Sequence, residues 1–286
     1  MTELQKIEFE ILKSFIEVCR KLNLRYYLIC GSALGAVKYG GFIPWDDDID
    51  VALPRADYNV LIERGQMYLP KKYFLQSYKN ESGLAIISAK IKDSTTTYIE
   101  KDHSHLKKIN HGVFIDVIPL DFYNEGDEEF TKRFEHFNRC RRVHLKSPET
   151  YKNIIKSCLK PLFNIHRYYG DFERYLSCPD HNTYPYYCNL HNAKNNNAFL
   201  PVEVYGNGAV AKFEGIDVII PERYDEYLTA YYGDWRADLP DDQKVGHHYY
   251  EIMDLEHPYT DHIGKITHIG RKIKLRKPKK TTHKMQ

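Results

Sequence analysis

The sequence predicts an α/β protein in which a small mixed sheet is flanked by helices, and three observations support this prediction. Residues 4–22 carry apolar side chains at the spacing of an amphipathic helix. The apolar segments 26–30 and 48–53 have the length and composition of short buried strands. A further run, 111–121, is dominated by β-branched and aromatic residues, which favour strands.

The composition limits the size and the setting of the protein. With 286 residues and 42% hydrophobic residues, the chain suits one large domain or a core with an appended subdomain. The net charge of +2 does not indicate a polyanion binder, so no nucleic-acid partner is expected. There is no apolar run of about 18 residues and no signal-peptide core in residues 1–10. We therefore expect a cytoplasmic protein whose cysteines are mostly reduced.

The chemistry is concentrated in residues 30–53. Gly31 and Ser32 follow the first predicted strand, where a helix could begin, and Ser32 suits the N-cap of that helix. The free backbone N–H groups beside Ser32 suit a phosphate. Asp48 and Asp50 lie two residues apart in the next predicted strand and therefore point to the same side of it.

Two carboxylates on one strand face repel each other. At about 4 Å and an effective dielectric of about 20, the repulsion is on the order of 4 kcal/mol. Mg²⁺ removes such a repulsion, because it prefers oxygen ligands and is commonly held by one or two carboxylates together with substrate phosphates. The alternative is a solvated acidic turn, which the preceding Gly-Ser turn and the apolar flanks make less attractive.

The same stretch resembles the LicD family of the nucleotidyltransferase-like superfamily. The superfamily pattern is a Gly-Ser turn followed by Asp-hydrophobic-Asp-hydrophobic, which residues 31–32 and 48–51 match. Segments 34–37 and 41–50 are similar to the LicD version in particular. The resemblance implies a nucleotidyltransferase-like core with a helical insertion and a C-terminal segment.

A helix over 55–64 and strands over 73–78 and 84–92 follow. Lys90 and Lys92 alternate with an isoleucine on the second of these strands and therefore face one side together. Either lysine could hold a phosphate, or both could face solvent; the resemblance favours Lys92 as a substrate ligand. We also assign Lys38, which directly follows the LicD-like segment 34–37, to substrate binding.

Asp116 stands alone among apolar residues in the predicted strand 111–121. A carboxylate in such a strand is costly unless it is paired or binds a metal. Superfamily sites often take a third acidic residue from a later strand, so the resemblance assigns Asp116 to the metal site with Asp48 and Asp50. Asp121 follows a proline and is interpreted as the cap of a loop.

Helices predicted over 127–144 and 151–176 form a helical insertion without evident chemistry. Two Cys-x-x-His pairs come next, and their spacing is compatible with a tetrahedral zinc site. Chance pairing remains the simpler explanation in a chain with 6 cysteines. The four residues concerned are Cys178, His181, Cys188 and His191.

The resemblance resumes from residue 186 to residue 248, with a predicted hairpin over 213–221 and a helix over 224–232. Residues 264–286 contain nine Lys/Arg and no acid, which suits contact with an anionic membrane surface or glycan. We predict four parts: a catalytic core, the helical insertion, a C-terminal part of the same domain and a basic tail. Their ranges are 1–125, 126–180, 181–262 and 263–286.

The resemblance implies an enzyme that moves a phospho-alcohol, such as phosphocholine, from a CDP-activated donor to a hydroxyl of a cell-surface glycan. Asp48, Asp50 and Asp116 would hold Mg²⁺ or Mn²⁺, and Gly31 and Ser32 would hold the donor phosphates. One carboxylate, in the first instance Asp116, would take the acceptor proton. Two alternatives remain: a nucleotidyltransferase that moves NMP, and a non-enzymatic anion-binding protein.

Overall fold

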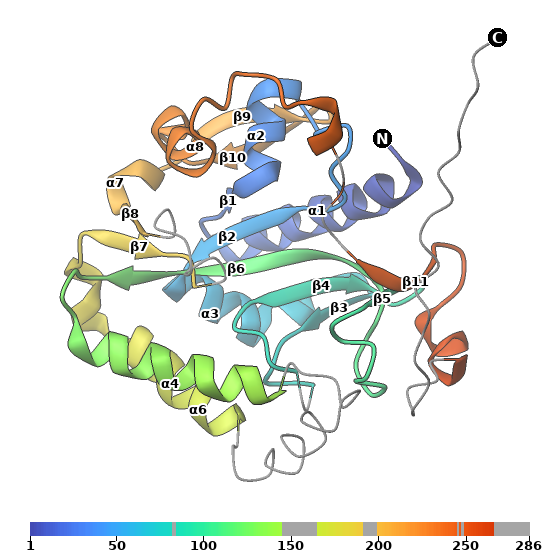
Figure 1. Cartoon of the computed structure of the whole chain (residues 1–286), viewed down its shortest axis with the longest axis horizontal. Helices are drawn as coiled ribbons and strands as arrows, with labels where there is room; N and C mark the ends of the chain where they lie inside the picture. The colour runs from blue at the N-terminus through green and yellow to red at the C-terminus, as the bar shows by residue number, and fades with distance from the viewer. Residues whose placement is uncertain (82–83, 145–164, 191–198, 245, 247–248, 266–286) are drawn as a thin grey trace.

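A mixed sheet of seven strands forms the centre of the computed structural model (Figure 1), which describes residues 1–81, 84–144, 165–190, 199–244, 246 and 249–265. Five strands lie in the order β1-β2-β6-β4-β3, and β7 and β8 extend the sheet beside the far end of β6. Only β2 and β6 are parallel; the other pairs are antiparallel. The strands are β1 (Tyr27–Leu28), β2 (Asp50–Pro54), β3 (Tyr73–Gln76), β4 (Ala89–Asp93), β6 (Val113–Tyr123), β7 (Tyr186–Cys188) and β8 (Phe199–Pro201). The mixed α/β architecture predicted from the sequence is confirmed.

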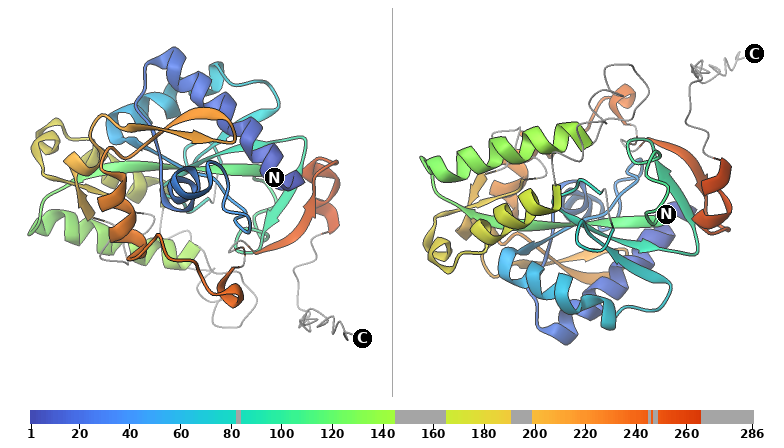
Figure 2. Two further views of the ribbon diagram at one scale, coloured as in Figure 1. Left: turned by 90° about the horizontal axis from the view of Figure 1, so that it is seen from above. Right: turned by 90° about the horizontal axis from the view of Figure 1, so that it is seen from below.

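Helices surround this sheet and two small antiparallel ladders complete the fold (Figures 1 and 2). The helices are α1 (Glu3–Leu22), α2 (Cys30–Tyr39), α3 (Arg55–Arg64), α4 (Glu128–His144), α6 (Ile165–Leu176), α7 (Val202–Tyr205) and α8 (Tyr224–Tyr232). One ladder is β9 (Ala209–Phe213) with β10 (Ile216–Ile220), and the other is β5 (Thr97–Glu100) with β11 (Tyr250–Asp254). No helix among these described residues is long and apolar enough to cross a membrane.

The N-terminal helix α1 forms because its sequence caps both ends and provides one apolar face that packs against the sheet. Thr2 and Gln5 make reciprocal hydrogen bonds between side chain and backbone at the start, which is a capping box. Asn23 ends the helix in the left-handed region with φ 53°. The buried face includes Leu12 and Phe15 and packs against β4 and β6. The helix predicted over 4–22 is thus confirmed.

Strand β6 connects the main parts of the molecule. Its first half lies between β2 and β4, and its last three residues pair with β7. The green β6 ribbon accordingly runs through the centre of Figure 1 towards the helical insertion. Side chains on this strand therefore reach both the sheet centre and the helices α4 and α6.

The helices α4 and α6 pack against each other through aromatic side chains such as Phe130, Phe137 and Phe172. Cys188 and Tyr78 of the rest of the chain belong to the same buried cluster, so the insertion is packed onto the core. Residues 145–164, which include part of the predicted second helix, lie outside the described residues. The division of the chain into four parts stays a prediction.

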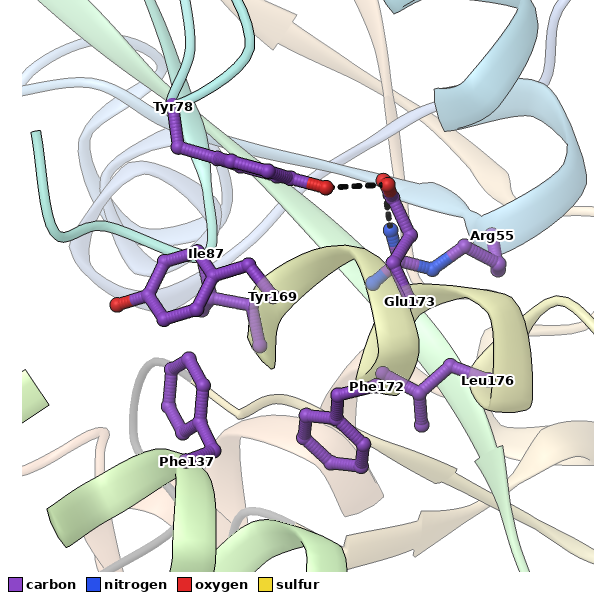
Figure 3. A pocket seen from close by; sticks show the side chains of 8 residues that line it. All are labelled: Arg55, Tyr78, Ile87, Phe137, Tyr169, Phe172, Glu173 and Leu176. Atoms are coloured by element: carbon purple, nitrogen blue, oxygen red, sulfur yellow. Dashed lines mark hydrogen bonds and ion pairs between the residues drawn. The ribbon is translucent and has the colours of Figure 1, made fainter. Parts of the chain in front are cut away.

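Asp121 joins the insertion to the core, and its interpretation as a loop cap is wrong. It is fully buried within β6 and accepts two hydrogen bonds from Arg55 of α3, at 2.6 and 2.8 Å. Arg55 also lies 3.4 Å from Glu173 of α6, which accepts a hydrogen bond from Tyr78 at 2.6 Å (Figure 3). The strand continues past Pro119 because its partner β2 ends at that level and β7 replaces it.

Candidate active site

Three consecutive aspartates in the loop between α2 and β2 form an acidic loop, Asp46–Asp48. One carboxylate oxygen from each residue lies within 4.8 Å of those from the others. Across the described part of the chain, this is the single cluster of potential metal ligands. Gln5 of α1 donates its Nε2 to the Asp46 carbonyl oxygen at 2.9 Å, which places the N-terminal helix beside the acidic loop.

Asp50 and Asp116 lie opposite each other on neighbouring parallel strands. Asp50 is the first residue of β2, and its register partner in β6 is Asp116. The Asp116 N–H donates to the carbonyl oxygen of Ile49 at 2.9 Å. Register partners on adjacent strands face the same side of a sheet, so the structure brings these two predicted site residues together. Asp48 is placed differently from the prediction, since β2 begins only at Asp50 and Asp48 belongs to the acidic loop.

Gly31 and Ser32 lie in the first turn of α2 and support the aspartates. Ser32 does not cap the helix as predicted; the N-cap is Ile29, without a side-chain bond. The Ser32 Oγ instead accepts a hydrogen bond from the Asp50 N–H at 2.9 Å. A Cβ atom at Gly31 would lie 2.6 Å from Asp46 Oδ2, so any side chain at this position would displace that carboxylate. Phosphate binding by Gly31 and Ser32 stays a prediction.

Negative charge accumulates at this end of the sheet. Burial raises the pKa of Asp46 to about 8, and the charge of Asp48 and its hydrogen bond to Asp46 contribute to the same shift. Burial also raises the pKa of Glu8 in α1 well above its usual range, and the carboxylates of the acidic loop and of Asp116 raise it further. Sequence reasoning missed Glu8, because it treated this helix as purely structural.

These residues fit a hard divalent cation. The clustered donor atoms are carboxylate oxygens, which Mg²⁺ and Mn²⁺ accept as ligands. One oxygen of Glu8, Oε2, is buried without a hydrogen-bond partner among the described residues. A bound cation would relieve the mutual repulsion of the clustered carboxylates.

A buried pair of lysines lies next to Asp116. Lys90 is its register partner in β4, and the Lys90 Nζ lies 3.5 Å from both oxygens of Asp116 and 2.8 Å from Glu100 Oε1. Lys92 is fully buried, with its Nζ 3.2 Å from Glu100 Oε2. The alternative of two solvent-facing lysines is therefore wrong. Substrate binding by Lys92 stays a prediction, but Lys90 is the lysine that contacts the aspartate.

The two lysines differ in their electrostatics. Burial and the neighbouring charge of Lys90 lower the pKa of Lys92 to about 8 against the opposing attraction of Glu100. For Lys90, burial lowers the pKa, but the charges of Asp116 and Glu100 overcome this and raise it. Lys90 therefore remains a cation that fixes the Asp116 carboxylate. Both ammonium groups also lie over the Phe114 ring, at 3.4 and 4.3 Å from its centroid.

Lys38 of α2 binds the C-terminal part of the chain. Its Nζ donates to the carbonyl oxygens of Arg236 and Ala237 at 3.0 and 2.8 Å and lies 3.1 Å from Asp238. The same part of the chain approaches the acidic loop at Gly246, where a Cβ atom would lie 2.6 Å from Asp47 Oδ2. Lys38 thus holds a segment that borders the site, and its assignment to substrate stays a prediction.

The structure offers no support for a zinc site in the described residues. Cys178, His181 and Cys188 are described, and none of them belongs to a cluster with ligand spacing. His181 stacks against Tyr184 with ring centroids 4.8 Å apart. His191 lies outside the described residues.

Comparison with known proteins adds independent information. The family model described as "LicD/FKTN/FKRP, nucleotidyltransferase domain" matches residues 23–162, which include the acidic loop and Asp116. The chain is 26% identical to the lipopolysaccharide cholinephosphotransferase LicD of Haemophilus influenzae, over 89% of this chain and 98% of that protein. It is also 26% identical to an uncharacterised protein of Rickettsia typhi, over 58% of this chain and 47% of the relative.

Proposed function

The chain belongs to the LicD family and is a phosphotransferase, and we propose that it moves a phospho-alcohol, such as phosphocholine, from a CDP-activated donor to a hydroxyl of a cell-surface glycan. The name of the Haemophilus relative supports choline phosphate as the group transferred and lipopolysaccharide as the kind of acceptor. Lipopolysaccharide, teichoic acid and capsule are all glycans that would offer the required hydroxyl.

One observation supports this chemistry most strongly: Asp50 and Asp116 are register partners on adjacent parallel strands, with the acidic loop directly before Asp50. Phosphoryl transfer needs positioned reactants and neutralised charge rather than a protein nucleophile. An acidic, oxygen-rich site at the start of β2 meets that requirement once it has bound a cation. A protein that only binds anions gains nothing from gathered carboxylates.

In this proposal, different residues hold the cation, orient the base and accept the proton. Asp48, Asp50 and Asp116 would hold Mg²⁺ or Mn²⁺, which, when bound, neutralises phosphate charge and stabilises the leaving oxygen. Lys90 orients the Asp116 carboxylate, and Asp116 accepts the proton of the acceptor hydroxyl. The acceptor oxygen forms its bond to the phosphorus of the phospho-alcohol, the bond from that phosphorus to the CMP oxygen breaks, and CMP leaves.

Product analysis tests the proposal. The full chain is incubated with CDP-choline, Mg²⁺ and a lipopolysaccharide acceptor, and CMP release is followed together with the mass of the glycan. Free CMP and a glycan heavier by one phosphocholine group are expected. Pyrophosphate release from a nucleoside triphosphate with a nucleotidylated glycan would support the nucleotidyltransferase alternative. Binding of donor or glycan without any product, across a panel of CDP-alcohols, would favour a non-enzymatic anion-binding protein.

A further inference from the structure

Glu8 lies on the face of α1 that borders the acidic loop. It follows Gln5 by three residues, and side chains at this spacing lie on the same face of a helix. Gln5 is hydrogen-bonded to the Asp46 carbonyl oxygen at 2.9 Å, so this face is fixed against the loop. Both side chains are buried in the structure. Glu8 is therefore held one helical turn from a direct contact between α1 and the acidic loop.

In the described part of the chain, the buried carboxyl group of Glu8 lacks the hydrogen-bond and ion-pair partners that would compensate for its burial. Only 3% of the residue is exposed, and its Oε2 has no hydrogen-bond partner among the described residues. No lysine or arginine of the described chain forms an ion pair with it within 4.0 Å. The charges that act most strongly on it are those of the acidic loop and Asp116, all negative. Burying a carboxyl group in such surroundings costs free energy unless a ligand provides the missing partner.

Tyr98 of β5 provides a second sign of an uncompleted site. It is 3% exposed, and its hydroxyl is buried without a hydrogen-bond partner in the described part of the chain. The charges of Asp47, Glu100 and Glu8 act on this hydroxyl. Glu8 of α1 and Tyr98 of β5, which are far apart in the sequence, thus both have a buried polar atom without a hydrogen-bond partner in the described residues, and both feel the charge of the acidic loop.

We propose that Glu8 is a further carboxylate ligand of the divalent-cation site, which makes the N-terminal helix part of the catalytic centre. This inference rests on the metal dependence in the proposed function. The cation class is Mg²⁺ or Mn²⁺, because every donor offered by the site is an oxygen.

Mn²⁺ binding by the full chain tests this role without any transfer reaction. Glu8→Gln keeps the shape of a protonated glutamic acid but removes its capacity to become a carboxylate. We expect its Mn²⁺ affinity, measured by calorimetry or by the EPR signal of free Mn²⁺, to fall at least about 10-fold. The rise in Tm caused by a fixed Mn²⁺ concentration should shrink accordingly. Unchanged affinity would show that Glu8 is only a buried neutral acid and would overturn the proposal.

Three further variants make the result interpretable. Glu10→Gln removes an exposed acid of the same helix, paired with Lys13, and should bind Mn²⁺ as the wild type does. Glu8→Asp keeps the carboxylate but shortens the side chain by one methylene group, which moves the charge away from the proposed cation. The Mn²⁺ affinity of this variant should lie between those of the wild type and Glu8→Gln. Should Glu8→Gln not fold, normal affinity in Glu8→Asp would count against the proposal. Asp48→Asn is the positive control for loss of binding.

The control also separates the two levels of inference. If Asp48→Asn loses Mn²⁺ and Glu8→Gln binds normally, only the role of Glu8 fails. If both variants bind as the wild type does, the metal dependence of the proposed function fails as well.

Discussion

The position of each carboxylate determines what it can do. Asp116 has a neighbour on each side of its strand: Asp50 in β2 and Lys90 in β4. The lysine holds both carboxylate oxygens at 3.5 Å and leaves the side towards Asp50 for the proposed cation and the acceptor. This asymmetry suits a base more than a residue that only neutralises charge.

Asp116→Asn should therefore lower kcat at least about 100-fold, the lower range for loss of a general base. The effect on the KM for the CDP-activated donor should be smaller, because Asp48 and Asp50 remain. Steady-state kinetics with a soluble acceptor measure both constants. A variant with near-normal kcat would remove Asp116 from the reaction and leave the base unassigned.

His111 gives the protein an acid sensitivity that is separate from the metal site. It is fully buried, and its Nε2 lies 2.8 Å from the carbonyl oxygen of Leu106, which can only accept, so the proton is on Nε2. Its Nδ1 is buried without a partner in the described residues. Burial lowers the pKa of His111 to about 4 from the ordinary value of 6.5. The unfolded chain therefore binds a proton between pH 6.5 and 4 that the folded protein does not.

Stability should consequently fall as the pH is lowered through this interval. The contribution of His111 amounts to about 2 kcal/mol lost between pH 7 and pH 5. Denaturant unfolding in the presence of a chelator measures the loss. In His111→Gln, whose amide can still donate to Leu106, the same pH change should cost about 2 kcal/mol less. Parallel pH profiles in the two proteins would show that other groups cause the acid sensitivity.

At the level of elements, the pair Arg55–Asp121 fixes the helical insertion to the sheet. Asp121 is fully buried in β6, Arg55 belongs to α3, and Arg55 also reaches Glu173 of α6. A small cavity of about 10 Å³ adjoins this network, bordered by Arg55, Glu173 and aromatic side chains (Figure 3). Removing one partner of a buried ion pair leaves the other charge unpaired, which is more harmful than removing both.

Asp121→Asn should lower the free energy of unfolding by about 3–5 kcal/mol. The double variant Arg55→Met/Asp121→Leu should lose less than Asp121→Asn. Asp57→Asn is a matched control, since its partner Arg25 is 61% exposed, and it should cost less than about 1 kcal/mol. Equal effects of Asp121→Asn and Asp57→Asn in chemical denaturation would contradict the linking role of Asp121.

For the whole molecule, local sequence patterns predicted most helices and strands. They failed for features that depend on contacts between segments far apart in the sequence. The helices at 4–22, 55–64 and 224–232 were predicted almost to the residue, because periodicity and end residues define them locally. The choice between Lys90 and Lys92 depends on the β4–β6 register, which is a tertiary property. Glu8 escaped notice for the same reason: its face of α1 becomes acidic only beside the loop.

The basic tail gives a prediction at this scale. Residues 266–286 lie outside the described residues and contain eight Lys/Arg without an acid. Truncation after His262, which removes the whole predicted tail 263–286, should leave transfer to a small soluble acceptor unchanged but weaken sedimentation with anionic vesicles, by up to about 1 kcal/mol per basic residue near the surface. Association of the full chain should also fall with salt. Equal sedimentation with neutral and anionic vesicles would rule out an electrostatic role for the tail.

The position of β6 between β2 and β4 has a consequence for how the chain is made. Both neighbours precede β6 in the sequence, so a chain still on the ribosome holds two strands that have no partner between them. Unpaired strand edges invite association with other chains. Among β1, β2, β3, β4 and β6, strand β6 is the last in the sequence, and it carries Asp116. A nascent or truncated chain that ends before β6 therefore lacks both the centre of its sheet and a working site.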